Sequence, residues 1–230
     1  MPHPPTDHAK WTPLALASDI RTATSAGTVW NGAEIVIWRD SAGTAHAWED
    51  RCPHRGMKLS FGFVRGDRIA CLYHGWEYDS TAACRYIPAH PELDVPATIR
   101  VARYKAAEAL GMIWVAPLDQ SAPAPVDETK VSALRSLQVD APLPVLTQLL
   151  ATAGLPGAGG VRDVVVDGSV IRLTQGALRL IAGLHPVDGA TSILHLGVQG
   201  TCAPDTLATL VPATAALRRL AETTAAGAAQ

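Results

Sequence analysis

Two short segments that each combine a cysteine with a histidine constrain this chain more than any other feature. Cys52 and His54 stand two positions apart, Cys71 and His74 stand three positions apart, and sixteen residues separate His54 from Cys71. Two thiols and two imidazoles in two matched loops suit a two-iron cluster with cysteine on one iron and histidine on the other. The sequence therefore predicts a metal centre within residues 51–76.

Structural zinc is the alternative use of two cysteines and two histidines. In a typical zinc finger the two cysteines form one knuckle and the two histidines lie together. Here each loop carries one residue of each kind. Interleaved loops can then deliver both thiols to one iron and both imidazoles to the other, so we favour the iron pair.

The sequence around both loops resembles the N-terminal domain of Rieske non-haem iron oxygenases, of the ring-hydroxylating and demethylating types. The resemblance covers about residues 11–117 and implies one [2Fe-2S] cluster per chain. It also implies that the cluster ligands are Cys52, His54, Cys71 and His74. The segments that carry it are 37–40, 48–50, 52–62, 71–79, 87–89 and 111–115.

Residues next to the four ligands are expected to surround the cluster. Gly56 and Gly75 let the backbone pass close to it and direct N–H groups at its sulfurs. Trp76 is expected to cover one side and limit access of water. The full predicted set is Arg55, Gly56, Tyr73, Gly75 and Trp76. Ala82 stands where the family often has a turn glycine, and a positive φ there would cost about 1 kcal/mol.

The loops also predict a reduction potential. Respiratory Rieske proteins carry an extra cysteine in each loop and a serine after the second His-Gly pair, where this chain has Trp76. Fewer hydrogen bonds to the cluster should lower the potential toward the negative end of the range of about −150 to +300 mV. Such a centre accepts one electron from a flavin reductase or a ferredoxin and passes it on.

Short runs of β-branched and aromatic residues with turn signals predict a mainly β protein, α+β overall. We expect an antiparallel Rieske β domain over 11–117, a Pro/Ala-rich linker over 118–128 and a second domain over 129–226. The second domain is predicted as a small β-meander plus a C-terminal helix, resembling a truncated helix-grip domain. Strands are expected at 33–38, 44–49, 97–104, 111–115, 161–166, 169–173, 177–184 and 191–198, and helices at 129–137, 145–153 and 206–226.

In the family the second domain holds a mononuclear iron on two histidines and a carboxylate. After the linker this chain has only His185 and His195, on either side of an Asp188-Gly189 turn. A two-residue turn there would place the two histidines on opposite faces of the hairpin. We therefore predict that the second domain, about half the usual length, has no mononuclear iron site, and we assign no catalytic residue.

Composition excludes several classes of function. The net charge is −2 with no basic stripe, so binding to nucleic acid is not expected, and no membrane partner is expected because the chain offers no good candidate span. Prolines interrupt the longest uncharged stretch, and the N-terminus has no secretory signal, so a cytoplasmic protein is expected. The remaining cysteines, Cys84 and Cys202, and the strand residue His46 are interpreted as structural. His3 and His8 are expected in a solvated tail.

The preferred hypothesis is a Rieske iron–sulfur oxidoreductase component that transfers single electrons in an oxygenase or demethylase system. Its donor would be a flavin reductase or ferredoxin, and its acceptor an oxygenase or a neighbouring subunit, with a homo-oligomer possible. One alternative is an oxygenase α-type subunit whose mononuclear iron site is unconventional or completed by a partner. The other is a non-catalytic, redox-sensing interaction protein.

Overall fold

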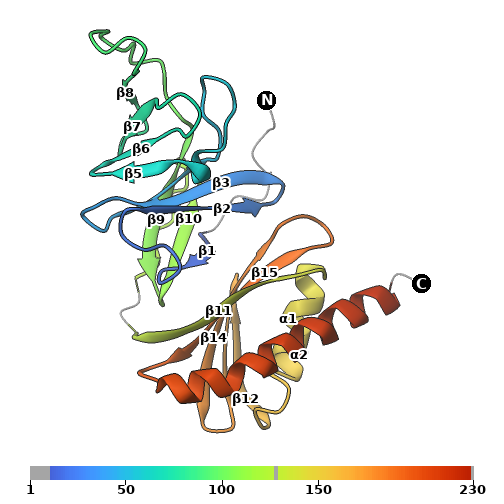
Figure 1. The fold of residues 1–230 in the computed structure, drawn as a ribbon. Coiled ribbons are helices and arrows are strands. Elements are labelled where there is room, and N and C mark those ends of the chain that lie inside the picture. Colours follow the sequence, from blue (N-terminus) through green and yellow to red (C-terminus); the bar gives the residue numbers. More distant parts are fainter. Residues whose placement is uncertain (1–10, 127–128, 229–230) are drawn as a thin grey trace. The chain divides into compact units, whose positions relative to one another are not determined.

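The computed structural model describes residues 11–126 and 129–228 (Figure 1). Its strands pair antiparallel and dominate the fold, which confirms the mainly β class. The chain forms two compact units. The described parts of the first unit are Asp19–Ala107 and Val115–Pro123, and those of the second are 11–18, Glu108–Trp114, 124–126 and 129–228.

The strands up to residue 116 form a six-stranded sheet, β1-β10-β9-β4-β3-β2, and a four-stranded sheet, β5-β6-β7-β8. In β3, Ile35 to Trp38 are fully buried, as expected for β-branched and aromatic residues in a central strand. The bounds are β1 Thr12–Leu16, β2 Thr24–Trp30, β3 Ala33–Arg39, β4 Ala45–Glu49, η1 Leu59–Phe61, β5 Phe63–Arg65, β6 Arg68–Ala70, β7 Glu77–Asp79, β8 Cys84–Tyr86, β9 Arg103–Ala109 and β10 Met112–Ala116.

The β3–β4 hairpin closes through Asp40. Its carboxylate accepts a hydrogen bond from the Thr44 backbone N–H at 2.8 Å and lies 3.0 Å from His46 Nε2. The His46 ring also stacks on Trp38, with centroids 4.3 Å apart. His46 therefore holds the hairpin together, in agreement with its structural interpretation.

The predicted strand over 97–104 is wrong in position, because β9 begins only at Arg103. Residues 99–101 instead pair with the turn before β8 and with the first residue of that strand. Val101 donates its backbone N–H to Ala82 O at 2.9 Å, and Ile99 O accepts from Cys84 at 2.9 Å. The backbone of this segment thus supports the turn before β8.

Residues 129–228, the larger part of the second unit, form a five-stranded sheet in the order β11-β15-β14-β13-β12 with two helices (Figure 1). Its buried core joins apolar side chains of the sheet, such as Leu173 and Leu196, to Leu150 of α1 and Leu217 of α2. The bounds are β11 Val131–Val139, α1 Leu143–Thr152, β12 Val161–Asp167, β13 Val170–Gln175, β14 Leu178–Pro186, β15 Ser192–Gln199 and α2 Pro204–Ala228.

The helix predicted over 129–137 is wrong, because the segment forms strand β11. Its alanine, leucine and arginine residues have good helix propensity. However, β11 pairs with β15 from Val131 to Val139, and that long pairing outweighs local preference. The helix predicted over 145–153 is confirmed as α1, which begins after Pro142 with Pro144 in its first turn.

Two alanines adopt the left-handed conformation, which an L side chain disfavours by about 1–2 kcal/mol. Ala82 has φ +66° and is buried, whereas Ala23 has φ +58° and is exposed. We expect Ala23→Gly to raise the free energy of unfolding by about 1 kcal/mol. Ala82→Gly should be nearly neutral, because the lost burial of its methyl group, about 0.8 kcal/mol, offsets the relief. Urea denaturation of both variants measures this; an equal gain in both would contradict it.

Candidate functional site

The two cysteine–histidine loops have the same backbone structure despite their different spacing. In each, the cysteine N–H donates to the carbonyl five residues later, at 2.8 Å from Cys52 and 2.9 Å from Cys71. The glycine four residues after the cysteine donates back to the cysteine carbonyl, at 2.8 Å for Gly56 and 2.9 Å for Gly75. Both glycines have positive φ, +76° and +69°, which only glycine adopts without cost. The common feature is therefore a glycine four positions after the cysteine.

Each loop is held by contacts outside its own residues. Asp50, which is buried, accepts hydrogen bonds from the Ser60 backbone N–H at 2.7 Å and from its hydroxyl at 2.6 Å. This carboxylate joins the two ends of the first loop. In the second loop, Gly75 lies against Pro88, whose Cγ would be 2.9 Å from an added Cβ. Protein contacts alone therefore hold both loops in place.

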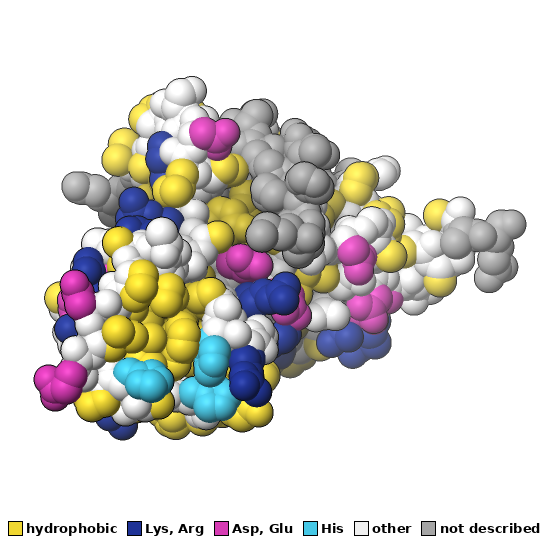
Figure 2. All heavy atoms as spheres, turned by 90° about the horizontal axis from the view of Figure 1, so that it is seen from above, with side chains coloured by type: hydrophobic (Ala, Val, Ile, Leu, Met, Phe, Trp, Pro, Cys, Tyr) yellow, Lys and Arg dark blue, Asp and Glu magenta, His cyan; other side chains and the backbone are white. Residues whose placement is uncertain are grey.

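The loops bring the four predicted ligands together as two pairs. The thiols of Cys52 and Cys71 are 2% and 3% exposed and are close enough to hydrogen-bond. The rings of His54 and His74 have centroids 4.7 Å apart at 62° and are more accessible. Figure 2 shows histidine side chains at the surface next to a patch of hydrophobic side chains. The pairs thus have different depths, with sulfur inside and imidazole outside.

Aromatic side chains cover both imidazoles. Trp76 stacks on His54 with a centroid distance of 4.3 Å and an interplanar angle of 4°. Tyr73, which is 55% exposed, lies against His74 at 3.8 Å. These contacts fix the ring orientations and reduce the access of water. That Trp76 covers one side of the bound cluster stays a prediction. Arg55 is exposed next to His54.

Tyr78 is a site residue that the sequence reasoning missed. Its phenol oxygen lies 3.1 Å from the sulfur of Cys52, and the side chain is fully buried. When the sulfur is a thiolate, the phenol O–H is the donor. The signal available in the sequence was strand alternation, since Tyr78 lies in the middle of β7 and points inward between partly buried neighbours.

Burial disfavours free thiolates at this site. Burial raises the pKa of Cys71, and the neighbouring Cys52 raises it further. Burial also raises the pKa of Cys84, which belongs to the same core, to about 11. Desolvation and the neighbouring His74 and Arg55 lower the pKa of His54, so its neutral form is favoured. Buried thiols that need a cation beside them, and the neutral imidazole of His54 near the surface, fit the donor set of a two-iron cluster.

Among the residues that the structure describes, no three His, Cys, Asp or Glu side chains gather around one point as ligands of a single metal ion. The predicted cluster residues instead lie in two pairs. A two-iron cluster requires two protein ligands per iron, so pairs are the arrangement it uses.

The prediction that His185 and His195 point to opposite faces is wrong. The β14–β15 loop has five residues, Val187 to Thr191, so the register shifts by one: His195 pairs with Gly183 and His185 with Ile193. Both histidines then lie on one face, buried and stacked at 5.2 Å, with His195 Nε2 3.2 Å from His185 Nδ1.

Each histidine of this pair also has a hydrogen-bond contact with an uncharged group outside the pair. His185 Nδ1 lies 3.0 Å from the Pro13 carbonyl oxygen, and His195 Nδ1 lies 2.9 Å from the Ser136 hydroxyl. Burial and the neighbouring His185 lower the pKa of His195 to about 3. His195 is therefore a neutral, hydrogen-bonded side chain in the core of the second unit.

Comparison with known proteins identifies the first of these sites. The family model described as the Rieske [2Fe-2S] domain matches residues 10–104. The chain therefore contains a Rieske domain, and a Rieske domain binds a [2Fe-2S] cluster. Its relatives include proteins named as a monooxygenase and a demethylase, which agrees with the resemblance seen in the sequence.

Two curated relatives show the extent of the match. Oxidoreductase NdmD of Pseudomonas putida is 39% identical over 109 residues, which are 47% of this chain and 18% of the relative. The 4beta-methylsterol monooxygenase of Methylococcus capsulatus is 41% identical over 117 residues, 49% of this chain and 30% of the relative. The chain thus matches less than a third of the length of either relative.

Solved structures match over a longer part of the chain. Dicamba monooxygenase bound to dicamba superposes with a TM-score of 0.78, covering 96% of this chain and 88% of that chain at 18% identity. At that identity the likeness establishes the fold, including that of the second unit. No helix in the described part of the chain is long and apolar enough to cross a membrane.

Proposed function

We propose that the chain is a single-electron carrier in an oxygenase or demethylase system. The observation that carries the proposal is a pair of buried thiols beneath a pair of accessible imidazoles within a Rieske domain. Cys52 and Cys71 would ligate one iron, and His54 and His74 the other. The bound cluster would supply storage of one electron at a time. We also propose the domain boundaries 11–117, 118–128 and 129–226.

The different depths of the two pairs suggest where the electron enters and leaves. The imidazole edges of His54 and His74 are nearer the surface than the sulfurs, so partners would contact that side. Exposed Leu72 and Tyr73, with Arg55, could provide a small and transient contact of less than about 1,200 Å². A flavin reductase or ferredoxin would be the donor, and an oxygenase or a neighbouring subunit the acceptor. One relative is named an oxidoreductase and another a methylxanthine N1-demethylase.

Electron paramagnetic resonance of the reduced protein, with iron quantified, tests this proposal. We expect a Rieske signal and about two irons per chain. Cys71→Ser should abolish both, whereas Cys84→Ser, which changes a buried thiol outside the two loops, should retain them. A zinc-loaded protein without the signal would contradict the proposal.

The second candidate is an oxygenase subunit with an unconventional or partner-completed mononuclear iron. The observation in its favour is that the fold of the second unit is shared with a monooxygenase, since the superposition covers 96% of this chain. Against it, ring nitrogens of His195 and His185 are hydrogen-bonded to the Ser136 hydroxyl and the Pro13 carbonyl, and within the described residues no three possible ligands gather around one point. A third iron per chain and substrate-dependent O₂ uptake with a generic reductase would favour the oxygenase and contradict the carrier.

Tyr78→Phe is expected to lower the reduction potential. The phenol donates to the Cys52 sulfur, and that bond is stronger when the cluster is reduced and more negative. A hydrogen bond to a charged group worth about 1–1.5 kcal/mol corresponds to a shift on the order of 50 mV for one electron. Redox titration followed by EPR measures the shift. Tyr104→Phe, in the same unit but with its ring edge-on to Trp30, should leave the potential unchanged; equal shifts in both variants would contradict the role of Tyr78.

A further inference from the structure

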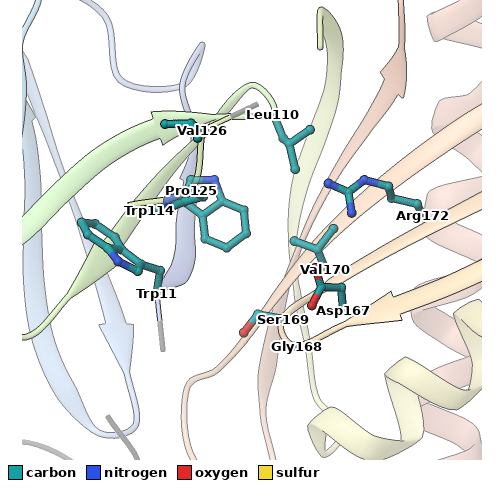
Figure 3. Close-up of a pocket in the computed structure, with 10 residues that line it drawn as sticks. All are labelled: Trp11, Leu110, Trp114, Pro125, Val126, Asp167, Gly168, Ser169, Val170 and Arg172. Carbon is teal, nitrogen blue, oxygen red and sulfur yellow. The ribbon is translucent and has the colours of Figure 1, made fainter. Parts of the chain in front are cut away.

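A small cavity in the second unit has a lining that none of the preceding functions uses. It has a volume of about 250 Å³ and lies between two indole rings and the end of the β12–β13 hairpin (Figure 3). All of its lining residues belong to the second unit. They are Trp11, Leu110, Trp114, Pro125, Val126, Asp167, Gly168, Ser169, Val170 and Arg172.

The aromatic wall is fixed by the fold. Trp114 is only 7% exposed, and its Nε1–H donates to the Ala109 carbonyl at 2.9 Å. The ring packs in a cluster with Val170 and Ile181, and Trp11 lies against the same cluster. Figure 3 shows the Trp114 ring facing the hairpin side of the cavity. A ring held in this way offers a flat apolar surface without further ordering.

The opposite wall is polar and is also built on a regular element. Asp167 pairs with Val170 across the two-residue turn, where Gly168 has φ +56°. On β13, Ile171 belongs to the helix-covered core, so strand alternation places Val170 and Arg172 on the other face. In Figure 3 the Asp167 carboxylate and the Arg172 guanidinium lie on the same side of the cavity, across from Trp114. One anion and one cation therefore border the same small space.

We propose that this cavity binds the zwitterion of an aromatic α-amino acid. The Arg172 guanidinium would bind the carboxylate, and Asp167 would bind the ammonium group. A guanidinium has five N–H donors, so it can do this in addition to its contacts within the protein. The aromatic ring would lie against Trp114 and Trp11. The volume falls just below the range of about 300–1,000 Å³ for drug-sized ligands, which restricts the occupant to a small molecule.

The charge pattern favours the zwitterion over a simple aromatic acid. An aromatic carboxylate would satisfy Arg172 but would place its charge near the Asp167 carboxylate, which disfavours binding. An aromatic amine would satisfy Asp167 but would place its positive charge near the Arg172 guanidinium, which also disfavours binding. Only a ligand that carries both charges close together satisfies both side chains. The site would give the second unit a binding role that needs neither the cluster nor an iron.

Binding of four probes to the intact, cluster-loaded protein tests this inference. The probes are L-phenylalanine, 3-phenylpropionate without the ammonium, phenethylamine without the carboxylate, and L-alanine without the ring. Titrations followed by protein NMR or calorimetry should show L-phenylalanine binding about tenfold or more tightly than each of the others. Stronger or equal binding of 3-phenylpropionate would overturn the proposal, as would no binding of L-phenylalanine at millimolar concentration.

Two variants test which side chain binds the carboxylate of the ligand and which binds its ammonium group. Arg172→Gln should weaken the binding of L-phenylalanine about 10- to 100-fold, so that L-phenylalanine no longer binds more tightly than phenethylamine. Asp167→Asn should remove its advantage over 3-phenylpropionate. Arg179→Gln changes an exposed arginine of β14 outside the lining and should bind like the wild type. Retained affinity in Arg172→Gln, or tighter binding of L-phenylalanine by Asp167→Asn, would overturn the assignment. The EPR signal of each variant keeps this result separate from the proposed carrier function.

Discussion

Replacing Gly62 with alanine is expected to lower the free energy of unfolding by about 2–3 kcal/mol and to reduce the iron content of the protein. Gly62 has φ −79°, so the cost does not come from its backbone angle. An added Cβ would instead collide with the carbonyl oxygen of Ala70 and lie 2.9 Å from that of Leu59. Both are backbone atoms and cannot move aside as the end of a flexible side chain can.

The position of Gly62 makes this collision important for the site. Gly62 donates its N–H to Leu59 O at 2.8 Å at the end of η1, directly after the first loop. Ala70 ends β6 and directly precedes Cys71 in the second loop. Pushing these segments apart therefore changes the distance between the two loops. Iron quantification and urea denaturation of the purified variant measure both effects.

Gly66→Ala is the matched control. Gly66 has φ +60°, but an added Cβ has no heavy atom within 4 Å. Its cost is therefore only that of the left-handed backbone, about 1 kcal/mol, and the iron content should not change. If both variants lost stability and iron equally, close packing of Gly62 between the loops would not be the cause.

The cluster loops could be predicted from the sequence because their structure is local. A glycine four positions after each cysteine closes both loops by hydrogen bonds within six residues, so the pattern is visible without knowledge of the fold. The short turns between the strands predicted over 33–38 and 44–49, and between those over 161–166 and 169–173, were predictable for the same reason. Local chemistry determined each of these features.

The features that the sequence did not reveal depend on long-range pairing. The contact of Tyr78 with Cys52 joins residues 26 positions apart, and strand β11 forms only by pairing with β15. The error at His185 and His195 came from assuming a two-residue turn where the loop has five residues. The strand pairing is therefore shifted by one residue, and such a shift moves a side chain to the opposite face of the sheet. Local residue preferences do not contain that information.

The histidine pair has a consequence for stability as a function of pH. Burial and the neighbouring His185 lower the pKa of His195 to about 3, below the ordinary value of 6.5. Between these values the unfolded chain binds a proton that the folded chain does not, so stability falls as the pH falls below about 6.5. From pH 7 to pH 5 the expected loss from this residue is about 1–2 kcal/mol.

Urea denaturation of the intact chain at several pH values tests this prediction by the difference between variants. His195→Gln should lose this part of the pH dependence, because an amide does not titrate. Ser136→Ala should lower stability at every pH by the loss of one hydrogen bond to His195, but it should keep the slope. The same slope in the wild type and in His195→Gln would show that the pair does not control acid stability. If the free energy of unfolding depends less on pH in His195→Gln but not in Ser136→Ala, burial of the neutral imidazole controls acid stability. Ser136→Ala disturbs the same hydrogen bond but leaves a histidine that can titrate.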